Sequence, residues 1–329
     1  MGISDEEKKD SNADDVDVEI VDVSDNGSNQ NVPDNSGSEG AGDELSPAPS
    51  GHKVRISKSD IIRYIIMGVA LCVFIFAAVS IFRKLNDYKK AREIYDNASL
   101  KVFNTRSETS GETEGPGETQ PDSDNQTGYQ YLDINFEELR NLSSEAIGWI
   151  DIPVCGISYP IVQHSDNEYY LNHTFDDTDD SKGFTWAGAI FLDYRNSPTF
   201  DDDHYYVYGH NMYDNSMFGN LLRYDDEEYF KANEGNNVFY IYTEDCIRKY
   251  EIFCITDASS ETQREAYYFT NDSFTVQDYV DFVTSIALYD TGVSATGDDQ
   301  IATLFTCQGE AKSPIRHLVH GKLVETIEK

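Results

Sequence analysis

One uninterrupted apolar run constrains this chain more than any other feature. From Tyr64 to Phe82, 19 consecutive residues carry no charge. As a helix, a run of this length spans about 29 Å, close to the thickness of the hydrocarbon core of a bilayer. The run begins far from the N-terminus, is too long for the apolar part of a signal peptide and precedes no evident cleavage pattern. We therefore interpret it as a membrane anchor with chain on both sides.

The charges beside the run do not fix its orientation. Four basic residues lie shortly before the run and five lie shortly after it: Lys53, Arg55, Lys58, Arg63, Arg83, Lys84, Lys89, Lys90 and Arg92. The positive-inside rule relies on an excess of Lys and Arg on one side, and here neither side has a clear one. The orientation must come from another property of the chain.

The remaining chain changes character along its length. Residues 1–60 hold 15 acidic against 5 basic residues, a composition that predicts a disordered acidic tail. After the anchor at 61–82, residues 83–128 predict a helical stalk and then a flexible linker rich in Ser, Gly, Thr and acidic residues. Residues 129–329 are long enough for one domain with a sizeable core. The formal net charge of −35 and the lack of a basic stripe argue against nucleic acid as a partner.

The C-terminal domain has the pattern of a mainly β protein with helical additions. A helix is predicted to open it, from Phe136 to Trp149. Short runs rich in β-formers follow, several alternating apolar and polar residues: Tyr159–Val162, Ala189–Asp193, Tyr205–Tyr208, Val238–Thr243, Arg248–Thr256, Gln300–Thr306 and His317–Val324. Residues 274–289 instead have helical spacing. Many short strands with an inserted helix predict a closed or nearly closed β-barrel.

Three residues at strand ends or edges could form a catalytic group. Cys307 ends an apolar run, Arg316 follows it by nine residues, and His210 lies 97 residues upstream. A thiol, an imidazole and a guanidinium can act as nucleophile, acid/base and oxyanion stabiliser. Each residue taken singly is more simply explained as part of the core, a turn or the surface. His317 is nearer to Cys307, but neighbours in a strand face opposite ways, so Arg316 and His317 cannot both face one site.

An ordered series of motifs resembles the sortase family, most closely class B. The series begins with Gly-Trp-Ile-x-Ile-Pro at 148–153 and Tyr-Pro-Ile-Val-Gln at 159–163, and continues with Asp-Asn-x-Tyr-Tyr-Leu-Asn-His at 166–173 and Gly-Ala-Ile-Phe-Leu-Asp at 188–193. Tyr-Gly-His-Asn-Met at 208–212 resembles the family's histidine region. Thr-Leu-Phe-Thr-Cys at 303–307 resembles its Thr-Leu-Ser-Thr-Cys motif, and Arg316 falls where the family has its arginine. The helix predicted at 274–289 matches one that class B enzymes carry.

This resemblance implies a fold, an activity and a location. It implies an eight-stranded sortase barrel and a single-pass enzyme of the cell membrane, with a cytoplasmic N-terminus and an extracellular catalytic domain. Cys307, His210 and Arg316 would be catalytic. They would cleave a C-terminal sorting motif after Thr through a thioester. The bound surface protein would then pass to an amine of the peptidoglycan or of its lipid-linked precursor. No metal and no cofactor is required.

One residue departs from the family pattern. Phe305 stands two residues before Cys307, where class B enzymes usually have Ser. In relatives this position lies near the bound peptide, so we expect Phe305 and Thr306 to contact the substrate. The usual class B sorting motif is correspondingly less certain here than the chemistry.

Three other functions use the same residues differently. A thiol peptidase would use the same site with water as the acceptor. A pilin-polymerising sortase would join subunits to one another. A non-enzymatic anchored adhesin would keep the barrel without reactivity at Cys307. The other cysteines, Cys72, Cys155, Cys246 and Cys254, match no disulfide or zinc spacing.

Overall fold

The computed structural model describes residues 57–103, 129–177, 183–307 and 314–329. The first 56 residues of the predicted tail and the predicted linker at 104–128 lie outside these ranges. The chain divides into two units, residues 1–81 and 82–329. The division of the sequence into tail, anchor, stalk with linker, and catalytic domain stays a prediction.

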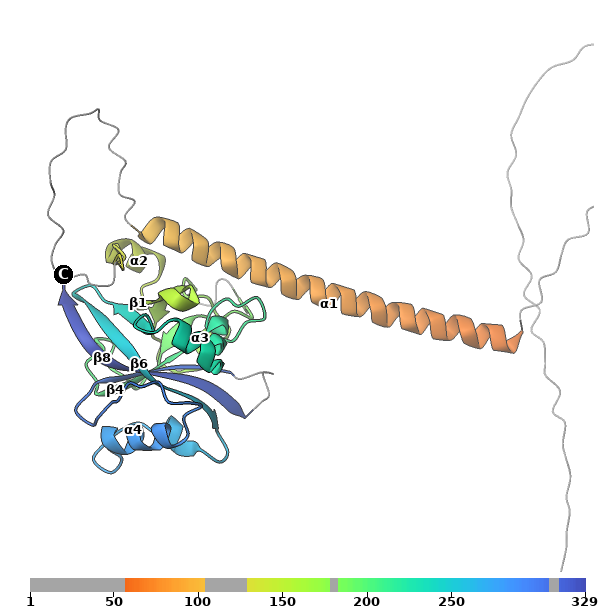
Figure 1. The fold of residues 1–329 in the computed structure, drawn as a ribbon. Helices are drawn as coiled ribbons and strands as arrows, with labels where there is room; N and C mark the ends of the chain where they lie inside the picture. Colours follow the sequence, from red (N-terminus) through yellow and green to blue (C-terminus); the bar gives the residue numbers. More distant parts are fainter. Residues whose placement is uncertain (1–56, 104–128, 178–182, 308–313) are drawn as a thin grey trace, which may run out of the picture. The chain divides into compact units, whose positions relative to one another are not determined.

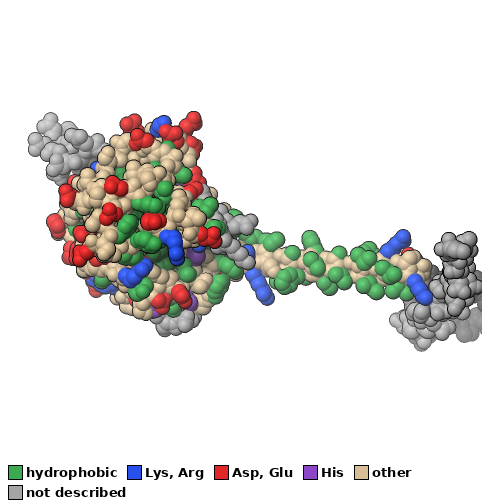
Figure 2. Space-filling model, turned by 90° about the horizontal axis from the view of Figure 1, so that it is seen from below, with side chains coloured by type: hydrophobic (Ala, Val, Ile, Leu, Met, Phe, Trp, Pro, Cys, Tyr) green, Lys and Arg blue, Asp and Glu red, His purple; other side chains and the backbone are tan. Residues whose placement is uncertain are grey.

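Helix α1, Lys58–Val102, contains the predicted anchor. Within the described ranges it is the one helix that is long and apolar enough to cross a membrane. Large apolar side chains from Ile61 to Phe82 are exposed along it, Phe76 to 76%, and Figure 2 shows such side chains covering the helix. Apolar surface of this extent is unfavourable in water and favourable in hydrocarbon. This part of α1 is therefore a candidate membrane span.

The last turns of α1 have a different environment. Ala91, Tyr95, Ala98 and Val102 are buried, each at most 5% exposed. They recur at the spacing of one helix face and pack into the hydrophobic core of the second unit. The apolar stripe of these turns therefore makes this end of α1 part of the second unit.

The second unit is an eight-stranded closed barrel of mixed strand direction (Figure 1), which confirms the predicted fold class. Around the barrel the order is β1-β2-β3-β4-β7-β8-β6-β5. The pairs β2/β3 and β4/β7 are parallel and the others are antiparallel. The strands are β1 Ala146–Ile152, β2 Ile157–Val162, β3 Ile190–Leu192, β4 His204–Tyr208, β5 Val238–Tyr242, β6 Cys246–Ser259, β7 Ile301–Cys307 and β8 Ile315–Glu328.

Among the described residues, three further α-helices and four 3-10 helices surround the barrel. They are α2 Phe136–Leu142, α3 Glu227–Ala232, α4 Val276–Ser285, η1 Pro153–Cys155, η2 Tyr169–Leu171, η3 Gly219–Asp225 and η4 Arg264–Tyr267. Helix α4 is the helix expected at 274–289. It begins with a capping box, in which the Thr275 side chain accepts from the Asp278 N–H and the Asp278 side chain accepts from the Thr275 N–H. Helix α4 lies against the outside of the barrel (Figure 1), and its buried side chains form one hydrophobic cluster with residues of β4, β6 and β7.

The predicted opening helix is too long. It ends at Leu142, where Ser143 is extended, and residues from Ala146 form β1 instead. The reason is tertiary. Strand β1 pairs with β2 on one side and with β5 on the other, so its backbone hydrogen bonds are satisfied in the sheet. Nearly every residue of β1 is buried, including Trp149 at 0% exposure, which removes the alternation by which a half-buried strand is recognised.

Close packing in the core requires a glycine in β8. A Cβ at Gly321 would lie 2.6 Å from Cζ of Phe239 and 3.0 Å from Cβ of Tyr250. These two rings stack with centroids 5.0 Å apart and planes 9° apart. Gly321 therefore lets the aromatic core approach the barrel wall.

Candidate active site

The three predicted catalytic residues lie at the same end of three adjacent strands. In the parallel pair β4/β7, Tyr208 is opposite Phe305, and the Gly209 N–H donates to the Phe305 carbonyl at 3.1 Å. Within this pair, His210 follows the last paired residue of β4 by two positions, as Cys307 follows the last paired residue of β7 by two positions. In the antiparallel pair β7/β8, Cys307 is directly opposite Arg316. Hydrogen bonding between strands thus gathers residues that are far apart in the sequence.

The chain leaves β4 through a glycine that has no room for a side chain. A Cβ at Gly209 would lie 2.6 Å from Cδ2 and 2.7 Å from Cγ of Phe218. The loop then folds back, because the Phe218 N–H donates to the His210 carbonyl at 2.9 Å. The tight packing at Gly209 and this hydrogen bond fix the backbone of His210.

The half-buried ring of His210 is held by a backbone carbonyl. Its Nε2 lies 2.6 Å from the carbonyl oxygen of Leu171 in η2. A carbonyl oxygen only accepts, so Nε2 carries a proton in both the neutral and the charged ring. This contact leaves Nδ1 as the ring nitrogen that does not face the Leu171 carbonyl.

Arg316 and Cys307 are described to different extents. Arg316 is half-buried at the start of β8, and its Nη1 donates to the Ile315 carbonyl at 3.0 Å. Cys307 has a described backbone as the last residue of β7, while its side chain lies outside the described part of the chain. The site is thus defined by the side chains of His210 and Arg316 and by the backbone of Cys307.

The two residues expected to contact substrate have unlike environments. Phe305 is partly buried, and its ring lies edge-on to Tyr208 at 4.9 Å and to Tyr267 at 5.5 Å between centroids. Thr306 is 1% exposed and lies opposite His317. The burial of Thr306 gives its side chain little access to a peptide, whereas Phe305 borders the site through an aromatic cluster.

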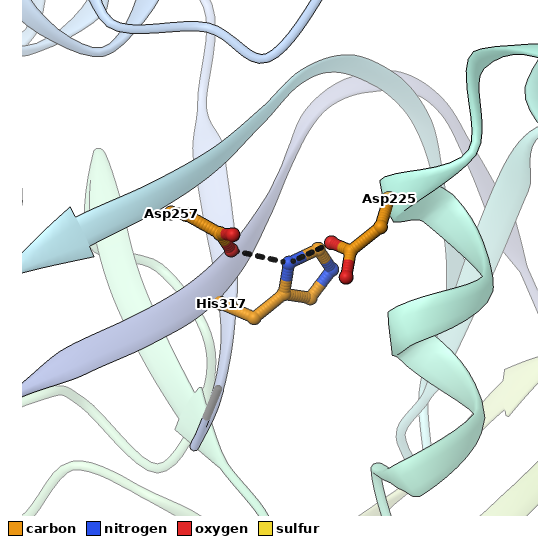
Figure 3. Close-up of side chains that lie close together, drawn as sticks. All are labelled: Asp225, Asp257 and His317. Carbon is orange, nitrogen blue, oxygen red and sulfur yellow. Dashed lines mark hydrogen bonds and ion pairs between the residues drawn. The ribbon is translucent and has the colours of Figure 1, made fainter. Parts of the chain in front are cut away.

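Behind the site, a buried histidine is held between two carboxylates (Figure 3). Nδ1 of His317 lies 3.0 Å from an oxygen of Asp225 and 3.0 Å from an oxygen of Asp257. Its Nε2 donates to the Leu221 carbonyl at 3.2 Å. Burial alone would lower the pKa of His317, but hydrogen bonds and the charges of both carboxylates outweigh it and raise the pKa to about 9. The imidazolium form donates from both nitrogens and satisfies this arrangement.

A second buried group joins α4 to the barrel wall. The Tyr279 hydroxyl lies 3.0 Å from Oγ1 of Thr303 and 3.2 Å from Nδ1 of His320. Nε2 of His320 lies 3.1 Å from Oγ1 of Thr256, and Nε2 of His204 lies 3.1 Å from Oγ1 of Thr303. Burial lowers the pKa of His204 to about 3, and burial and then the charges of His204 and His317 lower the pKa of His320. These histidines are neutral and serve as hydrogen-bonding groups.

Sequence reasoning did not find the groups that support the site. Asp225 and Asp257 belong to different elements, and their spacing to His317 has no pattern in the sequence. The ligand atoms of these three residues lie within 4.8 Å of one another, a spacing that could also hold a cation. Both contacts of Nδ1 are those expected of a protonated ring, so the arrangement of His317 between the two carboxylates does not require a metal ion.

Comparisons with known proteins all find similarity to sortases. Residues 150–324 match the model of the sortase domain. Over 260 residues the chain is 31% identical to sortase B of Listeria monocytogenes, covering 78% of this chain and 94% of that protein. It is 26% identical over 196 residues to sortase B of Staphylococcus aureus, covering 58% of this chain and 74% of that protein.

The solved structures agree. The structure of sortase B from B. anthracis matches with a TM-score of 0.53 and 29% identity, covering 73% of this chain and 99% of that chain. The family match spans more than half of the chain, and the barrel has the architecture that the motifs implied. The chain therefore belongs to the sortase family and is class B-like.

Proposed function

We propose that this protein is a membrane-anchored cysteine transpeptidase. It cleaves a sorting motif near the C-terminus of a surface protein after Thr, holds the protein as a thioester and transfers it to an amine of the cell wall. One observation supports this most. The backbone register of β4, β7 and β8 gathers His210, Cys307 and Arg316 at one end of three neighbouring strands.

In the first half-reaction Cys307 is the nucleophile. A free thiol has a pKa near 8.5, so a nearby cation is needed to favour the thiolate at neutral pH. The sulfur attacks the Thr carbonyl, and negative charge develops on the carbonyl oxygen. Arg316 stabilises that oxyanion together with backbone N–H groups. Collapse of the intermediate breaks the C–N bond and leaves a thioester.

His210 moves the proton in both half-reactions. As an imidazolium it protonates the leaving amine from Nδ1, since Nε2 remains on the Leu171 carbonyl. The neutral ring then takes a proton from the incoming amine at Nδ1 as that amine attacks the thioester. The C–S bond breaks and the thiolate returns. Two half-reactions through one acyl-enzyme predict ping-pong kinetics.

The proposed partners follow from this chemistry and from α1. The acyl donor is a surface protein with a C-terminal sorting signal, and the acceptor is an amine of peptidoglycan or of its lipid-linked precursor. Helix α1 anchors the enzyme in the cell membrane by one span, with the N-terminus cytoplasmic and the barrel extracellular. The Phe305 ring, held among Tyr208 and Tyr267, adds aromatic surface beside the nucleophile and would alter which motif fits.

The test uses the full-length protein in detergent micelles and measures intact masses. The protein is mixed with a panel of candidate sorting peptides, with and without an amine acceptor. We expect an acyl adduct on the wild-type protein and a peptide–amine product, and neither with Cys307→Ala. Cys72→Ala is the matched control, because Cys72 is an exposed thiol in α1 and its loss leaves the site intact. Formation of the free acid alone, even in excess amine, would contradict the transpeptidase in favour of a hydrolase.

A further inference from the structure

We propose that the last turns of α1 position His210 through contacts of Arg92 and Tyr95, which we call the brace. The helix that contains the candidate membrane span would thus also hold the active-site loop in place. This inference rests on the proposed role of His210. Two sets of contacts carry it, one to the backbone beneath the His210 ring and one to the loop that follows His210. All of them join residues of the second unit.

The first set runs from Tyr95 to the His210 ring. Tyr95 is 5% exposed, and its hydroxyl donates to the Gly188 carbonyl at 2.7 Å. Gly188 is pressed against the ring, because a Cβ there would lie 3.0 Å from Cδ2 of His210 and 2.9 Å from the Leu171 carbonyl oxygen. That Leu171 oxygen is the partner of Nε2 of His210. One tyrosine hydroxyl thus holds the peptide that supports both the ring and its hydrogen-bond acceptor.

The backbone conformation of Gly188 also fits this close approach to the His210 ring. Gly188 has φ +58, in the left-handed region that side chains disfavour. The next N–H, that of Ala189, donates to the Tyr170 carbonyl at 2.9 Å. The segment 188–189 is therefore held on one side by η2 and on the other by Tyr95. Without the Tyr95 hydroxyl the Gly188 carbonyl loses a buried donor, and this peptide is freer to move under His210.

The second set holds the loop 211–217. Nη2 of Arg92 lies 2.9 Å from Oδ2 of Asp214, whose other oxygen accepts from the Ser216 hydroxyl at 2.6 Å. Asn215 and Met217 have φ of 63 and 53, a strained conformation for residues with side chains. Contacts that hold strained backbone in place cluster at functional loops. Arg92 acts from α1 on a loop that has stored strain and adjoins His210.

A pocket of about 320 Å³ is lined by residues of both sets, among them Arg92, Tyr95, Asp214 and Met217. The Tyr95 ring packs in the core, while its hydroxyl and the Arg92 guanidinium make single polar contacts. Each contact can be removed by a single substitution without emptying a core. Tyr95 and Arg92 are positioning residues and do not touch substrate in this proposal.

The experiment compares Tyr95→Phe with Tyr88→Phe in the full-length protein in micelles. Tyr88 lies two turns earlier on α1 and packs partly buried against the same core, so it is a matched control. We expect Tyr95→Phe to lower kcat by about tenfold with KM unchanged, because a displaced acid/base slows chemistry more than binding. Tyr88→Phe should leave both constants within about twofold of the wild type.

A second measurement separates this inference from the proposed function. The imidazole NMR signals of His210, assigned by their loss in His210→Gln, report the ring environment whether or not a substrate is turned over. Tyr95→Phe and Arg92→Met should shift or broaden these signals, and Tyr88→Phe should not. An unchanged His210 signal in both α1 variants would overturn the brace. If the wild-type protein shows no transpeptidase activity but the His210 signals still shift in Tyr95→Phe and Arg92→Met, only the proposed function is contradicted.

Discussion

Two histidines of the same strand differ in charge, one being protonated and the other neutral at pH 7. His317 and His320 both lie in β8 at 0% exposure, and their spacing of three residues puts them on opposite faces of the strand. The pKa of His317 is raised to about 9, whereas that of His320 is lowered. Burial is the first cause acting on each, and it favours the neutral ring in both. The difference comes from the partners, since His317 has two carboxylates and His320 has hydroxyl groups.

The two groups also support different parts of the molecule. The His317 group, which comprises Asp225, Asp257 and His317, joins η3 and β6 to the end of β8 beside Arg316. The His320 group joins α4 to the middle of β7 and β8 through Tyr279 and Thr303. The charged group lies next to the proposed catalytic residues, and the neutral group fastens the inserted helix. The same side chain type thus makes a strong ionic link in one place and a weaker neutral link in the other.

The largest effect should come from removing the charge of His317. In His317→Leu the carboxylates of Asp225 and Asp257 lose the imidazolium that lies between them, and we expect a loss of about 3 kcal/mol in the free energy of unfolding at pH 7. Denaturant unfolding of the full-length protein in micelles measures this. His320→Leu, which leaves only neutral groups unpaired, should cost less, about 2 kcal/mol.

A triple variant tests the cause of that loss. Adding Asp225→Asn and Asp257→Asn to His317→Leu removes the repulsion between the carboxylates, so part of the lost stability should return. If the triple variant is less stable than His317→Leu, packing rather than charge explains the stability that His317 contributes.

A smaller effect should appear in the pH dependence of stability. The pKa of His317 is above the unfolded value of 6.5, so its contribution is complete below pH 6.5 and is lost as pH rises toward 9. We expect a decline on the order of 2 kcal/mol over that range, and His317→Gln should remove most of it. Thermal unfolding at a series of pH values measures both.

The neutral histidines should act in the opposite direction. The pKa of His204 is about 3 in the folded protein, so the stability from its neutral form is present above pH 6.5 and is lost as pH falls. His204→Gln should therefore flatten the acid side of the profile and leave the alkaline side unchanged. An alkaline decline that persists in His317→Gln would show that another group is responsible.

The sequence predicted the barrel more fully than the parts that support the site. Seven strands were predicted near their observed positions because they alternate or are short apolar runs between turns. The eighth, β1, is not predicted, and the helix predicted from Phe136 to Trp149 covers its first residues, because a strand buried on both faces does not alternate. The common location of His210, Cys307 and Arg316 followed from motifs, since strand register cannot be read from spacing alone.

The supporting residues could not have been found in the same way. Asp225, Asp257 and His317 come from three elements, and Tyr95 lies in a segment expected to be a stalk. Their contacts depend on tertiary structure, and each residue alone looks like an ordinary turn, strand or helix residue. Sequence did indicate that His317 and Arg316 face opposite ways, and the strand alternation agrees.

The smallest effect should come from a single hydroxyl of the neutral group. Tyr279→Phe removes the hydroxyl that lies near both Thr303 and His320, while Thr303 and His320 keep each other as partners at 3.1 Å. The loss should be about 1 kcal/mol, with no change on the alkaline side of the pH profile. Tyr240→Phe is the control, since Tyr240 is equally aromatic and 2% exposed but lies across the barrel, stacked on Tyr129. A loss in Tyr279→Phe as large as that in His317→Leu would mean that the neutral group links α4 as strongly as the ionic group links β8. Charge would then not be what distinguishes the two histidines.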